Sequence, residues 1–136
     1  MRQFIIASHG RFAEGILDSV RLISGEVEGV LAYGAYIDPE ENVEESVQTL
    51  LSGYAPEDEL IVVTDIMGGS VCNQFVRHLD RPNLHILAGM NLGLLLELFA
   101  NRDASLEEMI GAATSYAKTS VCYCNPIVEE MMNEQL

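Results

Sequence analysis

Basic side chains are scarce in this sequence. Seven Lys and Arg residues stand against 21 Asp and Glu residues, which gives a formal net charge of −14. Nucleic acids and anionic membranes are bound by clustered cations, so this charge argues against both as partners. The few, scattered arginines also argue against a kinase or phosphatase built on arginine clamps. The acidic clusters at 40–45 and 57–59 predict a solvated helix face and a turn, and the alternative is docking to a basic partner.

Long apolar runs and cysteines are also few. No stretch approaches the roughly 20 apolar residues that cross a bilayer, and the segment before His9 is too short for a signal-peptide core. We therefore expect a soluble, cytoplasmic protein. The three cysteines and the other histidines lack the spacing of a four-ligand zinc site. Reduced, buried thiols are expected, with no metal and no cofactor.

Short apolar runs alternate with longer segments of helical periodicity along a chain of 136 residues, 49% of them hydrophobic. This composition favours one domain. The runs predict strands, and the periodic segments predict helices that begin at capping residues such as Asn91 and Ser105. The predicted strands cover 3–8, 30–37, 60–64, 84–88 and 120–124, and the predicted helices cover 12–23, 43–51, 71–79, 92–100 and a segment after Ser105. The tail from residue 127 is compatible with a helix or a frayed end.

Strand and helix alternate four times, which predicts an α/β fold. Parallel strands need right-handed helical crossovers, so we expect a doubly wound, mainly parallel sheet flanked by helices. The usual strand order for this pattern is 2-1-3-4. Strands one and three are then neighbours about 4.8 Å apart, and ligands bind beyond their carboxyl ends. His9 ends the first strand and Asp65 ends the third, so the two side chains should meet there.

His9 and Asp65 together suit phosphoryl chemistry. A carboxylate that accepts a hydrogen bond from one ring nitrogen fixes the imidazole tautomer and leaves the other nitrogen as a nucleophile. Two helices are predicted to begin beside the pair, and their free N–H groups would bind an anion without lysine or arginine. Glycines there would let the backbone approach a phosphoryl group closely. The residues expected to bind that group are Gly10, Gly68, Gly69 and Ser70.

Each of these residues also has an ordinary structural interpretation. A histidine at a strand end can be a polar turn residue, Asp65 can cap a turn, and paired glycines are common in loops. Ser70 would either cap the third helix, which we favour, or donate its hydroxyl to a phosphoryl oxygen. The joint position of these residues at the two central strands favours the functional interpretation. His78 and His85 lack that position and are expected to be structural.

Three segments carry a family resemblance that runs over nearly the whole chain. They are Ala7-Ser8-His9-Gly10 at the end of the first strand, residues 64–73 with an Asp-x-x-Gly-Gly-Ser core, and Ala88-Gly89-Met90-Asn91-Leu92. Each motif is weak alone, whereas the combination is specific. With these motifs the sequence resembles the IIA component of the mannose/fructose/sorbose family of the bacterial phosphoenolpyruvate-dependent sugar phosphotransferase system.

The resemblance implies that residues 1–136 form a single IIA-type phosphocarrier domain, a phosphotransferase component with a phosphohistidine intermediate. His9 matches the family's phosphorylated histidine, modified on Nε2, and Asp65 matches the aspartate that hydrogen-bonds it. His9 would take the phosphoryl group from the phosphocarrier HPr and pass it to a IIB component. That component serves sugar uptake through the membrane subunits IIC and IID. The loop at residues 68–70 matches the one that borders the family's site.

The resemblance further implies a homodimer that exchanges a C-terminal antiparallel strand between its subunits. Residues 119–124 fit that strand, which would cover an open sheet edge. Met67, Val71 and Gly93 depart from the family's usual residues, and we expect them around the rim where partners dock. No IIB sequence follows, so a stand-alone subunit is expected.

Other functions stay open on the sequence. A protein of the same fold could donate phosphate to a dihydroxyacetone kinase instead of a IIB component. A non-catalytic regulatory module could use the same cleft to bind a small anion, although such a module would not need the pair of His9 and Asp65. A histidine phosphatase is disfavoured because Ser8, and not an arginine, precedes the histidine.

Overall fold

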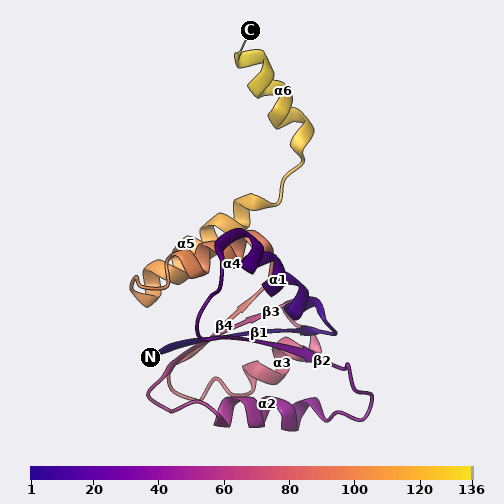
Figure 1. Cartoon of the computed structure of the whole chain (residues 1–136), viewed down its shortest axis with the longest axis vertical. Coiled ribbons are helices and arrows are strands. Elements are labelled where there is room, and N and C mark those ends of the chain that lie inside the picture. The colour runs from indigo at the N-terminus through magenta and orange to yellow at the C-terminus, as the bar shows by residue number, and fades with distance from the viewer. Residues whose placement is uncertain (136) are drawn as a thin grey trace.

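The computed structural model describes residues 1–135, which fold into a parallel sheet covered by helices on both faces (Figure 1). The strands lie in the order β2-β1-β3-β4, as the sequence predicts. They are β1 (Arg2–His9), β2 (Val30–Ala35), β3 (Glu59–Thr64) and β4 (Leu84–Ala88). The helices are α1 (Phe12–Ser24), α2 (Val43–Ser52), α3 (Ser70–Val76), α4 (Leu92–Ala100), α5 (Leu106–Ser120) and α6 (Cys124–Glu134).

Both faces of the sheet are buried, which explains why its strands show no alternation of polar and apolar residues. In β1, Phe4 and Ile6 pack in one cluster with α1, α4 and α5. Ile5 and Ala7 point the other way and pack with α2 and α3. Phe4 also makes an edge-to-face contact with Phe99 of α4, with ring centroids 5.2 Å apart. The strand that ends in His9 is therefore held by an apolar layer on each side.

Capping residues begin two helices as predicted. The side chain of Asn91 accepts the N–H of Leu94 at the start of α4, and Ser105 accepts the N–H of Glu108 at the start of α5. Both bonds satisfy donors that a helix cannot pair internally. Over residues 1–135, none of the helices is long and apolar enough to cross a bilayer.

The strand register brings three chain segments together at the carboxyl edge of the sheet. His9 pairs with Ala35 of β2, and β1 pairs with β3 up to Thr64, so Asp65 leaves the sheet beside His9. The N–H of Gly10 donates to the carbonyl oxygen of Ala35 at 2.7 Å and closes the turn after β1. The segments after β1, β2 and β3 therefore converge on one place.

The second strand and the third helix are shorter in the structure than the sequence predicts. β2 ends at Ala35 and not at Ile37, because Tyr36 adopts a left-handed conformation, φ 66°, that interrupts a strand. α3 begins at Ser70, one residue earlier than predicted, and ends at Val76, after which turns replace the predicted last helical residues.

The predicted strand at 120–124 is wrong for a single chain. Thr119 and Ser120 complete α5, residues 121–123 pair with no strand of the described chain, and α6 begins at Cys124. The chain leaves α5 away from the sheet and α6 projects from the body of the molecule, so this segment meets no strand of its own chain (Figure 1). The tail that the sequence left open is helical, and α6 buries none of its residues.

The cysteines match the expectation of buried thiols only in part. All three are free, as expected for reduced thiols, and Cys72 is buried in α3. Cys122 and Cys124 are exposed because they lie on the projecting segment. The prediction of burial is therefore wrong for these two residues.

Gly34 and Gly15 form a matched pair for testing the packing around the turn after β1. A Cβ at Gly34 of β2 would collide with the carbonyl oxygen of Gly10, whereas a Cβ at Gly15 of α1 meets no atom within 4 Å. We expect Gly34→Ala to lower the free energy of unfolding by about 1–3 kcal/mol. Gly15→Ala should raise it by about 0.5–1 kcal/mol, because alanine favours a helix interior. Urea unfolding followed by circular dichroism measures both changes. A Gly34→Ala variant with the same free energy of unfolding as wild type would contradict the close approach of Gly34 to the carbonyl oxygen of Gly10.

Candidate active site at the carboxyl ends of β1 and β3

His9 and Asp65 meet at the carboxyl edge of the sheet, as the sequence predicts. His9 is the last residue of β1, and Asp65 directly follows β3. The His9 side chain is 46% exposed and the Asp65 side chain is 14% exposed. The carboxylate is thus sheltered, whereas the ring remains open to a partner.

Asp65 orients the His9 ring. Its Oδ2 atom accepts the backbone N–H of His9 at 2.8 Å and lies 2.7 Å from the ring atom Nδ1. Its Oδ1 atom accepts the N–H of Ile66 at 2.9 Å. An ionised carboxylate only accepts hydrogen bonds, so these contacts assign the ring proton to Nδ1. Nε2 then carries the free lone pair.

The same hydrogen bonds keep Asp65 ionised. Partial burial raises the pKa of its carboxyl, but the contacts from the backbone and ring of His9 and from the N–H of Ile66 together outweigh burial. The pKa of Asp65 therefore lies below its usual value of about 3.9. At neutral pH a full negative charge stands beside Nδ1 and stabilises positive charge on the ring.

Ser70 lies on the opposite side of the ring from Asp65. Its Oγ atom is 3.3 Å from His9 Nε2 and accepts the hydroxyl of Tyr36 at 2.8 Å. The favoured prediction that Ser70 caps α3 is wrong, because Gly69 is the N-cap residue and no side chain caps this helix. Ser70 lies one residue past the N-cap position, and its hydroxyl points toward the imidazole instead.

The glycines shape the site in different ways. A Cβ at Gly69 would lie 3.4 Å from His9 Cε1 and 2.7 Å from Ile66 Cγ2, so the absence of a side chain lets the ring approach the loop. Gly68 and Gly10 have left-handed φ angles of 78° and 58°, which glycine adopts without strain. The N–H of Gly10 is already bonded to β2, so phosphoryl binding by Gly10 stays a prediction.

Two residues of the site are absent from the sequence-based prediction. The ring of Tyr36 lies beside that of His9, with centroids 5.6 Å apart and 33° between their planes. Ser8 is fully buried, and its Oγ atom accepts the N–H of Ala13 at 2.8 Å in the first turn of α1. Ala35 pairs with His9, so the residue after it lies next to the site. The prediction misses Tyr36 because it extends the second strand to Ile37.

The other histidines stand apart from this network. His78 follows α3 and His85 lies within β4, and neither hydrogen-bonds to His9 or Asp65 in the part of the chain that the structure describes. In that same part, no group of three or more His, Cys, Asp and Glu side chains could hold a metal ion. The groups that the structure brings together at the site are the imidazole of His9, the carboxylate of Asp65 and the hydroxyls of Ser70 and Tyr36.

The three residues expected around a docking rim occupy different environments. Met67 is 84% exposed on the loop after Asp65, where a partner could reach it. The expectation is wrong for Val71, which α3 turns into the core and buries completely. Gly93 lies in the first turn of α4 against the ring of Tyr116.

The chain matches the family model described as "PTS system fructose IIA component" over residues 3–114. It is 29% identical over 125 residues to the PTS mannose-specific EIIAB component of Escherichia coli (strain K12), covering 86% of this chain. It is 31% identical over 105 residues to the PTS sorbose-specific EIIA component of Klebsiella pneumoniae, covering 72% of this chain. The chain spans 38% of the length of the first relative and 73% of the second.

A solved structure shares both the fold and much of the sequence. It comes from Klebsiella pneumoniae subsp. pneumoniae and is assigned as a permease of the phosphoenolpyruvate-dependent sugar phosphotransferase system. It matches with a TM-score of 0.90 and 42% identity, over 93% of each chain. The chain therefore belongs to the mannose/fructose/sorbose IIA family of this phosphotransferase system.

Proposed function

We propose that this IIA protein is a cytoplasmic phosphocarrier in which His9 accepts a phosphoryl group on Nε2 from HPr and passes it to a IIB component. The observation that carries the proposal is the 2.7 Å contact between His9 Nδ1 and Asp65 Oδ2, which leaves Nε2 as the nucleophile. Membership of the family supports the class of reaction. The IIB component would then serve sugar uptake through membrane IIC and IID subunits.

The transfer step needs no proton movement. The lone pair of His9 Nε2 attacks phosphorus while the bond between phosphorus and the HPr donor breaks, and its electron pair returns to the donor. The ring keeps its Nδ1–H and becomes positively charged, and the ionised Asp65 stabilises that charge. Attack by a IIB acceptor on the same phosphorus reverses these events and restores the neutral ring.

The loop before α3 would hold the phosphoryl oxygens. Within residues 1–135, the N–H groups of Gly68 and Ser70 donate to no protein acceptor, and the Ser70 hydroxyl lies at Nε2. Gly69 leaves room beside the ring for the anion, and Gly10 shapes the turn on its other side. Fixed donors aimed at an oxyanion act without reorganisation, so the loop could bind the anion without the help of a cationic side chain.

The surface around His9 suits a protein partner. Apolar side chains are exposed on the segments that border the ring, and such surfaces are typical of interaction sites. The net charge of −14 would attract a phosphocarrier that presents a basic surface. The exposed apolar side chains are Phe12 (50%), Tyr36 (49%), Ile66 (58%) and Met67 (84%).

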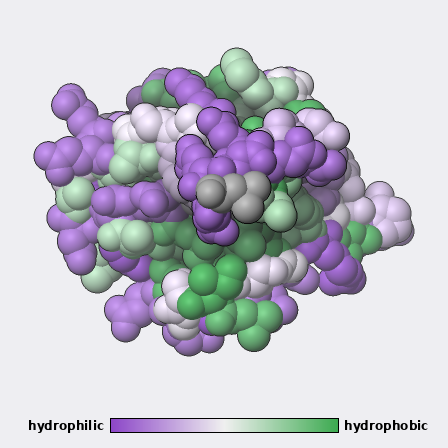
Figure 2. Space-filling model, turned by 90° about the horizontal axis from the view of Figure 1, so that it is seen from above, coloured by the Kyte–Doolittle hydropathy of each residue, from purple (hydrophilic) through white to green (hydrophobic). Residues whose placement is uncertain are grey.

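The proposal includes a homodimer with exchanged C-terminal segments. β4 pairs only with β3 among the strands of residues 1–135, so its outer edge is open. Val121 and Tyr123 have extended backbone conformations and are 85% and 72% exposed. Pairing of this segment with β4 of a second copy would cover both the open edge of β4 and the exposed side chains of the segment. Figure 2 looks down on the end from which α6 projects and shows apolar surface beside the polar surface there.

The labelling of His9 is the first test. Incubation with HPr, its phosphorylating kinase and phosphoenolpyruvate should give the protein one acid-labile, base-stable phosphate. His9→Ala should abolish the label, whereas His78→Ala and His85→Ala should keep it. Label that persists in His9→Ala would refute the assignment. Adding either a IIB protein or a dihydroxyacetone kinase to the labelled protein then identifies the acceptor. A wild type that takes no label would contradict the phosphocarrier function and favour the alternative of a non-catalytic anion-binding module.

Replacement of Asp65 tests the pairing. Asp65→Asn keeps the size of the side chain but removes its charge and lets its amide donate, so the ring loses its preferred tautomer. We expect the fold to persist and the rate of phosphoryl transfer to fall about 100-fold or more. Quenched-flow kinetics with phosphorylated HPr measures the rate, and circular dichroism checks the fold. Rates equal to those of wild type would show that the pairing has no catalytic role.

Replacement of exposed apolar residues on the C-terminal segment tests the dimer. Light scattering should give wild type twice the chain mass of 15.0 kDa. Val121→Asp with Tyr123→Asp should give the monomer mass, because charged side chains on this segment oppose its burial against β4. Leu22→Asp with Ile23→Asp, at positions 82% and 62% exposed at the end of α1, is the matched control and should stay dimeric. A monomeric wild type would contradict the exchange.

A further inference from the structure

Tyr36 is a feature of the site that the phosphocarrier proposal does not yet use. It directly follows Ala35, which pairs with His9 across the sheet. Its φ angle of 66° is rare for a bulky residue and costs conformational energy, which the surrounding structure must supply. The backbone N–H of Tyr36 donates to Glu41 Oε1 at 3.0 Å, and this bond holds the strained turn.

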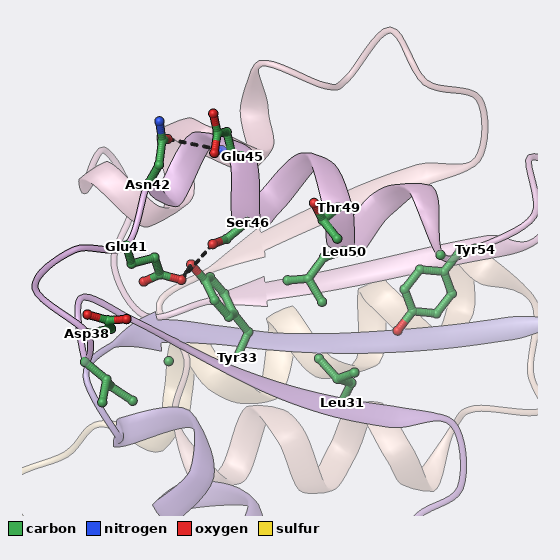
Figure 3. Close-up of a pocket in the computed structure, with 13 residues that line it drawn as sticks. Leu31, Tyr33, Asp38, Glu41, Asn42, Glu45, Ser46, Thr49, Leu50 and Tyr54 are labelled. Atoms are coloured by element: carbon green, nitrogen blue, oxygen red, sulfur yellow. Dashed lines mark hydrogen bonds between the residues drawn. The ribbon is translucent and has the colours of Figure 1, made fainter.

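Glu41 is itself held firmly. Its Oε2 atom accepts the hydroxyls of Tyr33 and Ser46, each at 2.8 Å, and Figure 3 shows these side chains converging on it from β2 and α2. Burial raises the pKa of Glu41, but the three hydrogen bonds outweigh burial and bring the pKa below its usual value. Burial, followed by the hydrogen bond to Glu41, raises the pKa of Tyr33 to about 12. Glu41 is thus a fixed anion that anchors the backbone of Tyr36.

The side chain of Tyr36 reaches from this anchor to the reacting nitrogen. Its hydroxyl donates to Ser70 Oγ at 2.8 Å, and Ser70 Oγ lies 3.3 Å from His9 Nε2. A serine hydroxyl has one proton, and the Ser70 oxygen already accepts the hydroxyl proton of Tyr36, so the Ser70 proton must point elsewhere. Because the ring proton is on Nδ1, Nε2 can only accept. The proton of Ser70 therefore points to Nε2.

We propose that Tyr36 is a positioning residue for phosphoryl transfer, and that it acts through Ser70. By donating to Ser70 Oγ, Tyr36 directs the Ser70 proton to Nε2 in the free protein and to a phosphoryl oxygen once Nε2 is phosphorylated. This inference rests on the proposed function of His9. Without the Tyr36 hydroxyl, the Ser70 hydroxyl would rotate among several orientations, and the transition state would lose a preorganised donor.

Tyr36→Phe isolates this role. Phenylalanine keeps the ring beside His9 and the backbone bond to Glu41, and it removes only the hydroxyl that reaches Ser70. Tyr54→Phe is the matched control. A cavity between β2 and α2 is lined by residues that include Glu41 and Tyr54, and these two lie at its opposite ends (Figure 3). In the described chain the Tyr54 hydroxyl makes no hydrogen bond to the site.

Quenched-flow kinetics with phosphorylated HPr as donor tests the proposal in five proteins: wild type, Tyr36→Phe, Tyr54→Phe, Ser70→Ala and the double variant of Tyr36 and Ser70. We expect Tyr36→Phe to lower kcat about tenfold with KM within about twofold of wild type, the effect of losing one oriented hydrogen bond. Tyr54→Phe should match wild type. In the Ser70→Ala background, Tyr36→Phe should have no further effect, because the group through which it acts is gone.

Three results would overturn the inference. The first is an unchanged kcat in Tyr36→Phe. The second is a change confined to KM, which would indicate a role in partner docking. The third is a double variant whose loss of kcat equals the product of the losses in the two single variants. In each of these, wild type still carries phosphate on His9, so the proposed function stands. Failure of the proposed function is seen separately, as a wild type that takes no label or a His9→Ala variant that keeps it.

Discussion

The hydrogen-bonded pair of Asp65 and His9 is the constraint on which the rest of the site depends. One oxygen, Asp65 Oδ2, accepts the backbone N–H of His9 and contacts its ring. The orientation of the imidazole is thereby tied to the register of β1 with β3. A slip of one residue would reverse the faces of a strand and separate the pair. The apolar layers on both sides of β1 therefore matter for the geometry of the site, because they hold this register.

The two nitrogens of the ring have unlike surroundings. A carboxylate stands at Nδ1, and the hydroxyl of Ser70, contacted by that of Tyr36, stands at Nε2. These groups come from segments far apart in the sequence that the strand order 2-1-3-4 brings to one edge. Such asymmetry fits the proposed carrier role, in which one nitrogen is held while the other would exchange a phosphoryl group with two partners.

The order of the four parallel strands, their approximate positions and the meeting of His9 with Asp65 could be predicted, because periodicity and crossover rules fix them. Ser70 could be placed at the site but its role could not be predicted, since one residue decides whether a serine caps a helix. Tyr36 could not be placed, because a left-handed tyrosine has no sequence signal and the predicted second strand therefore runs two residues too far. For the tail from residue 127 the sequence is compatible with a helix or a frayed end, and the structure has a helix there. The segment before it was predicted as a strand because its composition is strand-like, but within one chain it has no backbone partner.

Nitrogen NMR of the uncharged His9 ring tests the central claim most directly. Long-range proton–nitrogen correlations distinguish a protonated ring nitrogen from a bare one. In the uncharged ring we expect the proton on Nδ1 and a bare Nε2, and we expect Asp65→Asn to disturb this tautomer. A ring with its proton on Nε2 would contradict the account, because the nitrogen assigned as nucleophile would then have no free lone pair.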